Sequence, residues 1–187
     1  RQKNPFDSSV ADVLAMVQLK KGDCKAALAT IKNALSIDGS STLYHTHHGI
    51  ILRALGRFED ARKAYEEALA LDPEAPDTLF NLALLCQDTG DLRESLTLCL
   101  RVTRLDPSNA AAFNNLGTTH QHLGQFEEAA TAYRTAIALN PGHIGAYCNL
   151  AAALAEGDQI KDSLTVCEEA LEKWPGHSEI LNAQSNA

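Results

Sequence analysis

Apolar and small residues recur along this chain at helical spacing, and they do so in pairs of segments. Within 110–143, one set of such residues lies three or four positions apart, which predicts a helix that ends at Leu123–Gly124. That set is Ala112, Phe113, Leu116, Thr119 and His120. A second helix is predicted from about Phe126 to Leu139. It ends at Asn140–Pro141–Gly142, because proline cannot continue a helix and glycine tolerates the turn.

This two-helix pattern returns every 34 residues. The prolines that keep the period are Pro73, Pro107, Pro141 and Pro175. The glycines that keep it are Gly22, Gly56, Gly90 and Gly124, while Gly157 falls one residue early. Such glycines fit a tight turn between helices that needs a positive φ. The period predicts five helix–turn–helix units, at 8–41, 42–75, 76–109, 110–143 and 144–177.

Small residues also recur in phase, and they predict how the helices pack. Two closely packed antiparallel helices need a small residue where they cross, and we expect Gly117 on the first helix and Ala129 on the second to supply it. Ala136 would let the next unit dock. Because one unit alone cannot bury its apolar face, the units must stack.

The repeated residues resemble the tetratricopeptide repeat (TPR) family. The pattern is carried by Leu116–Gly117, Ala129, Tyr133, Ala136 and Pro141, and again by Gly49, Ala61, Tyr65, Ala68 and Pro73. The resemblance implies an all-α fold, a right-handed superhelical solenoid of five helix–turn–helix repeats with a short C-terminal cap helix. The chain departs from the family at His45, where a large aromatic is favoured, at Cys99 and Cys167 on the second helices, and at Gly39 in place of proline.

The domain organisation follows from the same phase. We expect a single TPR domain over 8–177, with 178–187 as a partial capping helix. Residues 1–7 are either a lead-in or the tail of an upstream repeat, because Pro5 is in phase with Pro73. Together with the absence of an initiator methionine, this favours a piece of a longer protein.

In the TPR family the first helices line a concave groove that holds a peptide or a partner's helix, and the repeat phase predicts five groove places in each unit. In order of the units, they are Ser9, Asp12, Val13, Met16 and Leu19; Leu43, Thr46, His47, Ile50 and Arg53; Asp77, Phe80, Asn81, Leu84 and Gln87; Ala111, Asn114, Asn115, Thr118 and Gln121; Gly145, Cys148, Asn149, Ala152 and Ala155. The residues that we expect to contact a partner are His47, Ile50, Arg53, Phe80, Asn81, Leu84, Gln87, Asn114, Asn115, Gln121 and Asn149.

Asparagine occupies one groove place three times, at Asn81, Asn115 and Asn149. An amide both donates and accepts hydrogen bonds, so such a ladder can bind a peptide main chain without selecting its side chains. The arrangement resembles the asparagine ladder of O-linked N-acetylglucosamine transferase. The alternative is that these amides brace neighbouring helices. The basic residues with which carboxylate-clamp cochaperones bind a partner's terminus have no counterpart here.

Composition narrows the function classes. The 187 residues carry a net charge of −8, which disfavours nucleic acid as a partner. No apolar run approaches the roughly 18 residues of a membrane span. Five cysteines, an odd number without a Cys-x-x-Cys, argue against a disulfide framework and for a reducing compartment, here the cytoplasm.

The sequence contains no Gly-x-Ser-x-Gly, P-loop, Gly-x-Gly-x-x-Gly or His-Glu-x-x-His motif, so we expect no catalytic residue and no cofactor. His45 and His48 share a helical face and could support a metal, but both occupy core places without an acidic or cysteine partner at helical spacing, so we expect no metal site. The leading function is a non-catalytic protein–protein interaction scaffold. The alternative is the substrate-recognition arm of a larger enzyme, such as an O-linked N-acetylglucosamine or fucose transferase. Self-association through the terminal repeats is a separate hypothesis.

Overall fold

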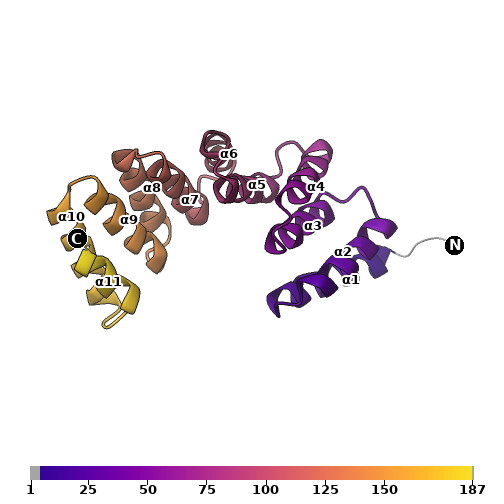
Figure 1. Ribbon diagram of the computed structural model, residues 1–187, viewed down its shortest axis with the longest axis horizontal. Helices are drawn as coiled ribbons and strands as arrows, with labels where there is room; N and C mark the ends of the chain where they lie inside the picture. The colour runs from indigo at the N-terminus through magenta and orange to yellow at the C-terminus, as the bar shows by residue number, and fades with distance from the viewer. Residues whose placement is uncertain (1–4, 187) are drawn as a thin grey trace. The chain divides into compact units, whose positions relative to one another are not determined.

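The computed structural model describes residues 5–186, which form α-helices and no strand (Figure 1). The helices are α1 (Pro5–Lys20), α2 (Cys24–Ile37), α3 (Thr42–Ala54), α4 (Phe58–Leu71), α5 (Pro76–Thr89), α6 (Leu92–Leu105), α7 (Ala110–His122), α8 (Phe126–Leu139), α9 (Ile144–Glu156), α10 (Ile160–Lys173) and α11 (Ser178–Asn186). The all-α class is confirmed, and the predicted second helix of 110–143 coincides with α8. Residues 1–4 of the predicted lead-in lie outside the described residues.

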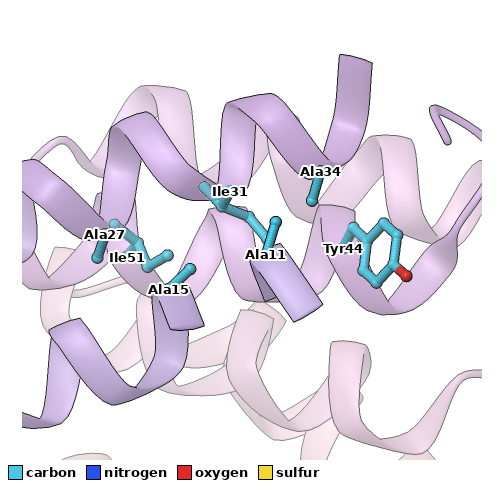
Figure 2. Close-up of a cluster of buried hydrophobic side chains, with 7 residues drawn as sticks. All are labelled: Ala11, Ala15, Ala27, Ile31, Ala34, Tyr44 and Ile51. Carbon is cyan, nitrogen blue, oxygen red and sulfur yellow. The ribbon is translucent and has the colours of Figure 1, made fainter. Parts of the chain in front are cut away.

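The chain divides into two compact units, Arg1–Asp91 and Leu92–Ala187. The first holds α1 to α5, in which α1 packs on α2, α3 on α4, and each second helix on the next first helix. Figure 2 shows that its core draws on three successive helices, because Tyr44 and Ile51 of α3 lie among side chains of α1 and α2. A helix pair therefore completes its core only with the helix that follows. Whether the five repeats form a single domain stays a prediction.

The second unit holds α6 to α11 and is built in the same way. Tyr133 of α8 is buried with Leu150 and Leu154 of α9. At the end of the unit, Ile180 of α11 is buried against α9 and α10. There Trp174 meets the Tyr147 ring edge-on, with 5.5 Å between the ring centroids.

Four in-phase glycines adopt the left-handed backbone conformation that the sequence predicted, at Gly22, Gly56, Gly90 and Gly124. The fifth turn differs from this pattern. Gly157 has a φ of −89°, and the next residue, Asp158, takes a φ of 60°. Position 158 is the one in phase with the other glycines, and aspartate is among the few other residues that tolerate this conformation. The turn geometry thus follows the period and not the glycine.

The crossing of Gly117 with Ala129 stays a prediction, and the structure shows that a further residue, Tyr133, packs against Gly117. A Cβ atom built on Gly117 would lie 2.6 Å from Cε1 of Tyr133, and one on Gly49 would lie closer still to Cε1 of Tyr65. Both tyrosines are fully buried. The missing side chain therefore makes room for an aromatic ring on the second helix. In the last repeat, Ala151 shares a core cluster with the much smaller Cys167.

Helix α1 leaves a row of apolar side chains exposed, at Val10, Val13, Leu14 and Val17. In the later repeats, the counterparts of Val10 and Val17 are buried, as Tyr44 and Ile51 illustrate. The difference arises because each later first helix packs on the second helix that precedes it, as α3 does on α2.

Candidate functional site

Six of the predicted groove places, in the second and third repeats, border a pocket of about 330 Å³ between α3 and α5, here called the inner pocket. Its lining is Thr42, Leu43, Thr46, His47, Ile50, Asp72, Ala75, Pro76, Asp77, Thr78 and Asn81. Helix α3 supplies Leu43, His47 and Ile50 from one face because these residues are three or four positions apart. Proline at the first position of α5 fixes the start of that helix and places Asp77 and Asn81 on the opposite wall.

The inner pocket combines an apolar wall with acidic and amide groups. Leu43 keeps half of its surface exposed (50%), and Ile50 is half-buried. The base is fixed by Thr46 and Thr78, whose buried hydroxyl oxygens lie 2.7 Å apart across the two helices. Asp72 and Asp77 add carboxylates, and both residues are exposed. The pocket therefore suits an aliphatic chain that ends in a hydrogen-bond donor or a positive charge.

In both units, a set of side-chain bonds between residues 35 apart joins consecutive first helices. In the first unit, His47 Nδ1 lies 2.6 Å from Asp12 Oδ1, and Arg53 Nε donates to Asp88 Oδ2 at 2.6 Å. In the second unit, Asn149 Nδ2 donates to Asn114 Oδ1 at 3.1 Å, and Gln121 Nε2 donates to Glu156 Oε1 at 2.9 Å. Five of the residues expected to contact a partner thus use a polar group to brace neighbouring helices.

These side-chain bonds affect the interpretation of the asparagine ladder, because an amide that braces two helices uses part of its hydrogen-bonding capacity. Asn149 donates to Asn114 on the neighbouring helix, and Asn81 Nδ2 donates to the backbone oxygen of Asp77 at 2.7 Å. Asn115 is half-buried in α7. Each amide has a second N–H and an oxygen with two lone pairs, so bracing and ligand contact are compatible. Ligand binding by the asparagine ladder therefore stays a prediction. The alternative, in which an amide braces neighbouring helices, is directly supported at Asn149.

The other predicted contacts are Phe80, Leu84 and Gln87, all half-buried on α5. Sequence reasoning did not include Asp88 and Glu156, which bond to Arg53 and Gln121. The sequence signal for each of them is a polar or oppositely charged residue that lies 35 positions after its partner, one more than the repeat length.

The two buried tyrosines that face the glycines differ in their hydroxyl environments. Tyr133 donates to Gln121 Oε1 at 2.9 Å and lies 3.2 Å from Thr118 Oγ1, and burial raises its pKa to about 12. The Tyr65 hydroxyl is buried without a hydrogen-bond partner among the described residues. Two repeat lengths before Thr118 and Gln121 stand Ile50 and Arg53, which offer no acceptor.

Removing the two hydroxyl groups should therefore have opposite effects. We expect Tyr133→Phe to lower the free energy of unfolding by about 1 kcal/mol, because it breaks a satisfied bond and leaves an acceptor behind. We expect Tyr65→Phe to leave the stability unchanged or to raise it by up to about 1 kcal/mol. Urea unfolding followed by circular dichroism measures both, and an equal loss in the two variants would contradict the assignment.

The histidines and cysteines show little reactive chemistry. His45 lies 3.0 Å from Glu67 of α4 and 2.9 Å from the backbone oxygen of Gly39. Although the sequence shows no acidic partner for His45 on its own helix, one is thus present on the next. Over the described part of the chain, no three His, Cys, Asp or Glu side chains gather as a metal site would require. The five cysteines, all among the described residues, form no disulfide, and burial raises the pKa of Cys99 and of Cys167, which keeps these thiols protonated.

His143 caps α9 by accepting a hydrogen bond from the backbone N–H of Ala146 at 3.2 Å. Across the described residues, no helix combines the length and the apolar character that crossing a membrane needs.

Comparison with solved structures identifies several that share this fold. A MamA fragment from Desulfovibrio magneticus RS-1 aligns with a TM-score of 0.79 at 19% identity, covering 91% of this chain and 98% of that one. TTC0263, a TPR protein of Thermus thermophilus, aligns at 0.77 and 18%, covering 96% and 98%. YrrB, described as a TPR protein with an unusual peptide-binding site, aligns at 0.74 and 20%, covering 94% and 90%. At such identities the likeness establishes the fold alone.

Comparison with protein families gives a direct match. No curated protein sequence matches the chain. Two profiles described as tetratricopeptide repeat match residues 47–110 and 110–143, which together make up just over half of the sequence. The chain therefore belongs to the tetratricopeptide repeat family.

Proposed function

We propose that this protein is a non-catalytic interaction scaffold that binds a peptide segment of a partner protein along its first helices. The observation that carries the proposal is the inner pocket, because six of its lining residues occupy groove places. These are Leu43, Thr46, His47, Ile50, Asp77 and Asn81.

The pocket chemistry favours one class of peptide. Leu43 and Ile50 would contact an aliphatic side chain, and Asp72 and Asp77 would attract a cation at its end. His47 and Arg53 add little charge, because each already faces a carboxylate, at Asp12 and at Asp88. We therefore propose an extended peptide that places a lysine or arginine in the inner pocket, with its methylene groups on the apolar wall.

The proposal is tested with an array of immobilised peptides probed by the labelled protein. We expect lysine- or arginine-containing peptides to be retained, and Leu43→Asp to weaken their binding about tenfold or more by placing a charge on the apolar wall. Leu71→Asp is the matched control, because Leu71 is similarly exposed (46% against 50%) and lies outside the pocket. If the wild type retains no peptide, or if both variants bind equally, the proposal fails.

The asparagine ladder is tested in the same assay with the triple variant Asn81→Ala, Asn115→Ala, Asn149→Ala, after its helicity is checked. If the amides bind the peptide main chain, the loss of affinity should be similar for all retained sequences. The remaining predictions are separate from this result. They are the cytoplasmic location, self-association through the terminal repeats, and a role as the substrate-recognition arm of a larger enzyme.

A further inference from the structure

A second pocket, of about 240 Å³, is lined by residues of α2, α3 and α4 and is here called the outer pocket. It is lined by Lys32, His48, Leu52, Arg57, Asp60, Lys63, Ala64 and Glu67. No groove place contributes to it. An inference about this pocket is thus independent of the proposed peptide site.

The repeat provides an internal reference for the outer pocket. Three repeat lengths later, a pocket of about 400 Å³ is lined by the corresponding residues Arg134, Leu150, Asp162, Thr165, Val166 and Glu169. In this comparison His48 replaces Leu150, and Lys63 replaces Thr165. Arg57 corresponds to Gln159. Three departures at one site thus replace apolar or neutral residues with basic ones.

These departures change the charge balance of the site. The reference pocket has Arg134 against Asp162 and Glu169, whereas the outer pocket has three cations against two carboxylates. Both carboxylates of the outer pocket are already engaged. Asp60 accepts from Arg57 Nε at 2.8 Å and from Nη2 at 2.5 Å, and Glu67 faces His45.

Two lysines and a histidine remain available. No ion pair or hydrogen bond joins the ammonium of Lys32 or Lys63 to another group in the described part of the chain. Both ring nitrogens of His48 are buried, and within residues 5–186 neither has a hydrogen-bond partner. Burial, and then the charge of Lys32, lowers the pKa of His48. The imidazole is therefore neutral at pH 7 and has one N–H to donate.

We propose that the outer pocket binds a phosphate group, with Lys32 and Lys63 pairing with its oxygens and His48 donating its ring N–H. Two unpaired ammonium groups match a dianion, and charge-assisted hydrogen bonds are the strong ones. The pocket volume is several times the roughly 30 Å³ that one water molecule occupies in the liquid, so a phosphate and its substituent fit. The group can come from free phosphate or from a phosphorylated side chain of a partner.

The test is an NMR titration of the protein with inorganic phosphate, with chloride at matched ionic strength as the reference. We expect a saturable shift of the His48 ring signals and a rise in Tm, since a ligand that binds only the folded state stabilises it. Lys63→Thr restores the residue of the later repeats, and we expect it to weaken binding about tenfold or more. Lys161→Thr, an exposed lysine of α10, is the control and should bind like the wild type.

The source of the group is distinguished by a second titration with O-phosphoserine. Tighter binding of phosphoserine than of phosphate supports a phosphorylated partner, and equal or weaker binding supports free phosphate. A shift that does not saturate, or one that persists unchanged in Lys63→Thr, overturns the proposal and leaves an adventitious ion only. Failure of the peptide array has no bearing on this result, because the two pockets share no residue.

Discussion

Replacing Gly117 with alanine is expected to destabilise the protein, although alanine is the better helix former. The added methyl carbon would lie 2.6 Å from Cε1 of Tyr133, a ring that is fully buried. Overpacking of this kind costs about 1–3 kcal/mol, and the helix propensity of alanine returns about 1 kcal/mol. The difference is a net loss of up to about 2 kcal/mol, which urea unfolding measures.

A second substitution should reverse the sign of this effect. Tyr133→Cys removes the ring and is expected to cost about 3–5 kcal/mol, as truncation of a large buried aromatic does. In that background Gly117→Ala should stabilise the protein, because the methyl group then enters free space and reproduces the combination of Ala151 with Cys167. If Gly117→Ala destabilises both backgrounds equally, the contact with Tyr133 is not the reason why position 117 excludes alanine.

The matched control is Gly145→Ala in α9, where the nearest atom to an added Cβ is His143 Cε1 at an ordinary 3.4 Å. This variant should be as stable as the wild type, or up to about 1 kcal/mol more stable.

Replacing His48 with leucine is expected to stabilise the protein by about 1–3 kcal/mol at pH 7, which is the penalty of a buried polar group without a partner. Leucine occupies the same place in the next three repeats, and Leu82, Leu116 and Leu150 are all buried. For a chain of this length the gain corresponds to about 2–4 °C in Tm for each kcal/mol. The measurement needs a phosphate-free buffer, since a bound anion would stabilise the wild type alone.

The gain from His48→Leu should grow as the pH falls. In the unfolded chain the imidazole titrates at about 6.5, whereas burial lowers the pKa of His48 in the folded state. Between these two values the unfolded state binds more protons, so the wild type loses stability as the pH drops below about 6.5. This loss of stability ends once the pH is below the folded-state pKa of His48. The His48→Leu variant has no imidazole at this position and is not subject to this loss.

Exposed His122 is the control, because His122→Leu should change the stability by no more than about 0.5 kcal/mol. Equal pH profiles for the wild type and His48→Leu would show that His48 titrates alike in both states and that its burial has no energetic effect.

The sequence was sufficient for the helices because the 34-residue period fixes where each begins and ends. The period even outweighs local residue type, since Asp158 takes the left-handed turn position beside Gly157. Contacts between different positions of the repeat were harder to predict. Glycine occurs with tyrosine at Gly49 and Tyr65 and again at Gly117 and Tyr133, but this pairing is not apparent when each position of the repeat is compared only with its equivalents in the other repeats.

The candidate sites were only partly predictable for the same reason. The phase placed His47, Ile50 and Asn81 on one surface, where they border the inner pocket. The helix-joining partners Asp88 and Glu156 lie outside the predicted groove places, so periodicity did not select them. For His48, the repeat indicated a core position, but the lack of a hydrogen-bond partner for its nitrogens among the described residues is a property of the packed structure.

The side-chain bonds between consecutive first helices have a mechanical consequence. Within each unit, a load that separates neighbouring repeats on the groove side must stretch bonds such as those from His47 to Asp12 and from Gln121 to Glu156. Asp88 and Glu156 are solvent-exposed, so water competes for their bonds to Arg53 and Gln121, and these two bonds rupture and re-form individually. Each unit should therefore yield elastically under small forces before its core opens. Salt would lower its stiffness by screening the Arg53–Asp88 pair.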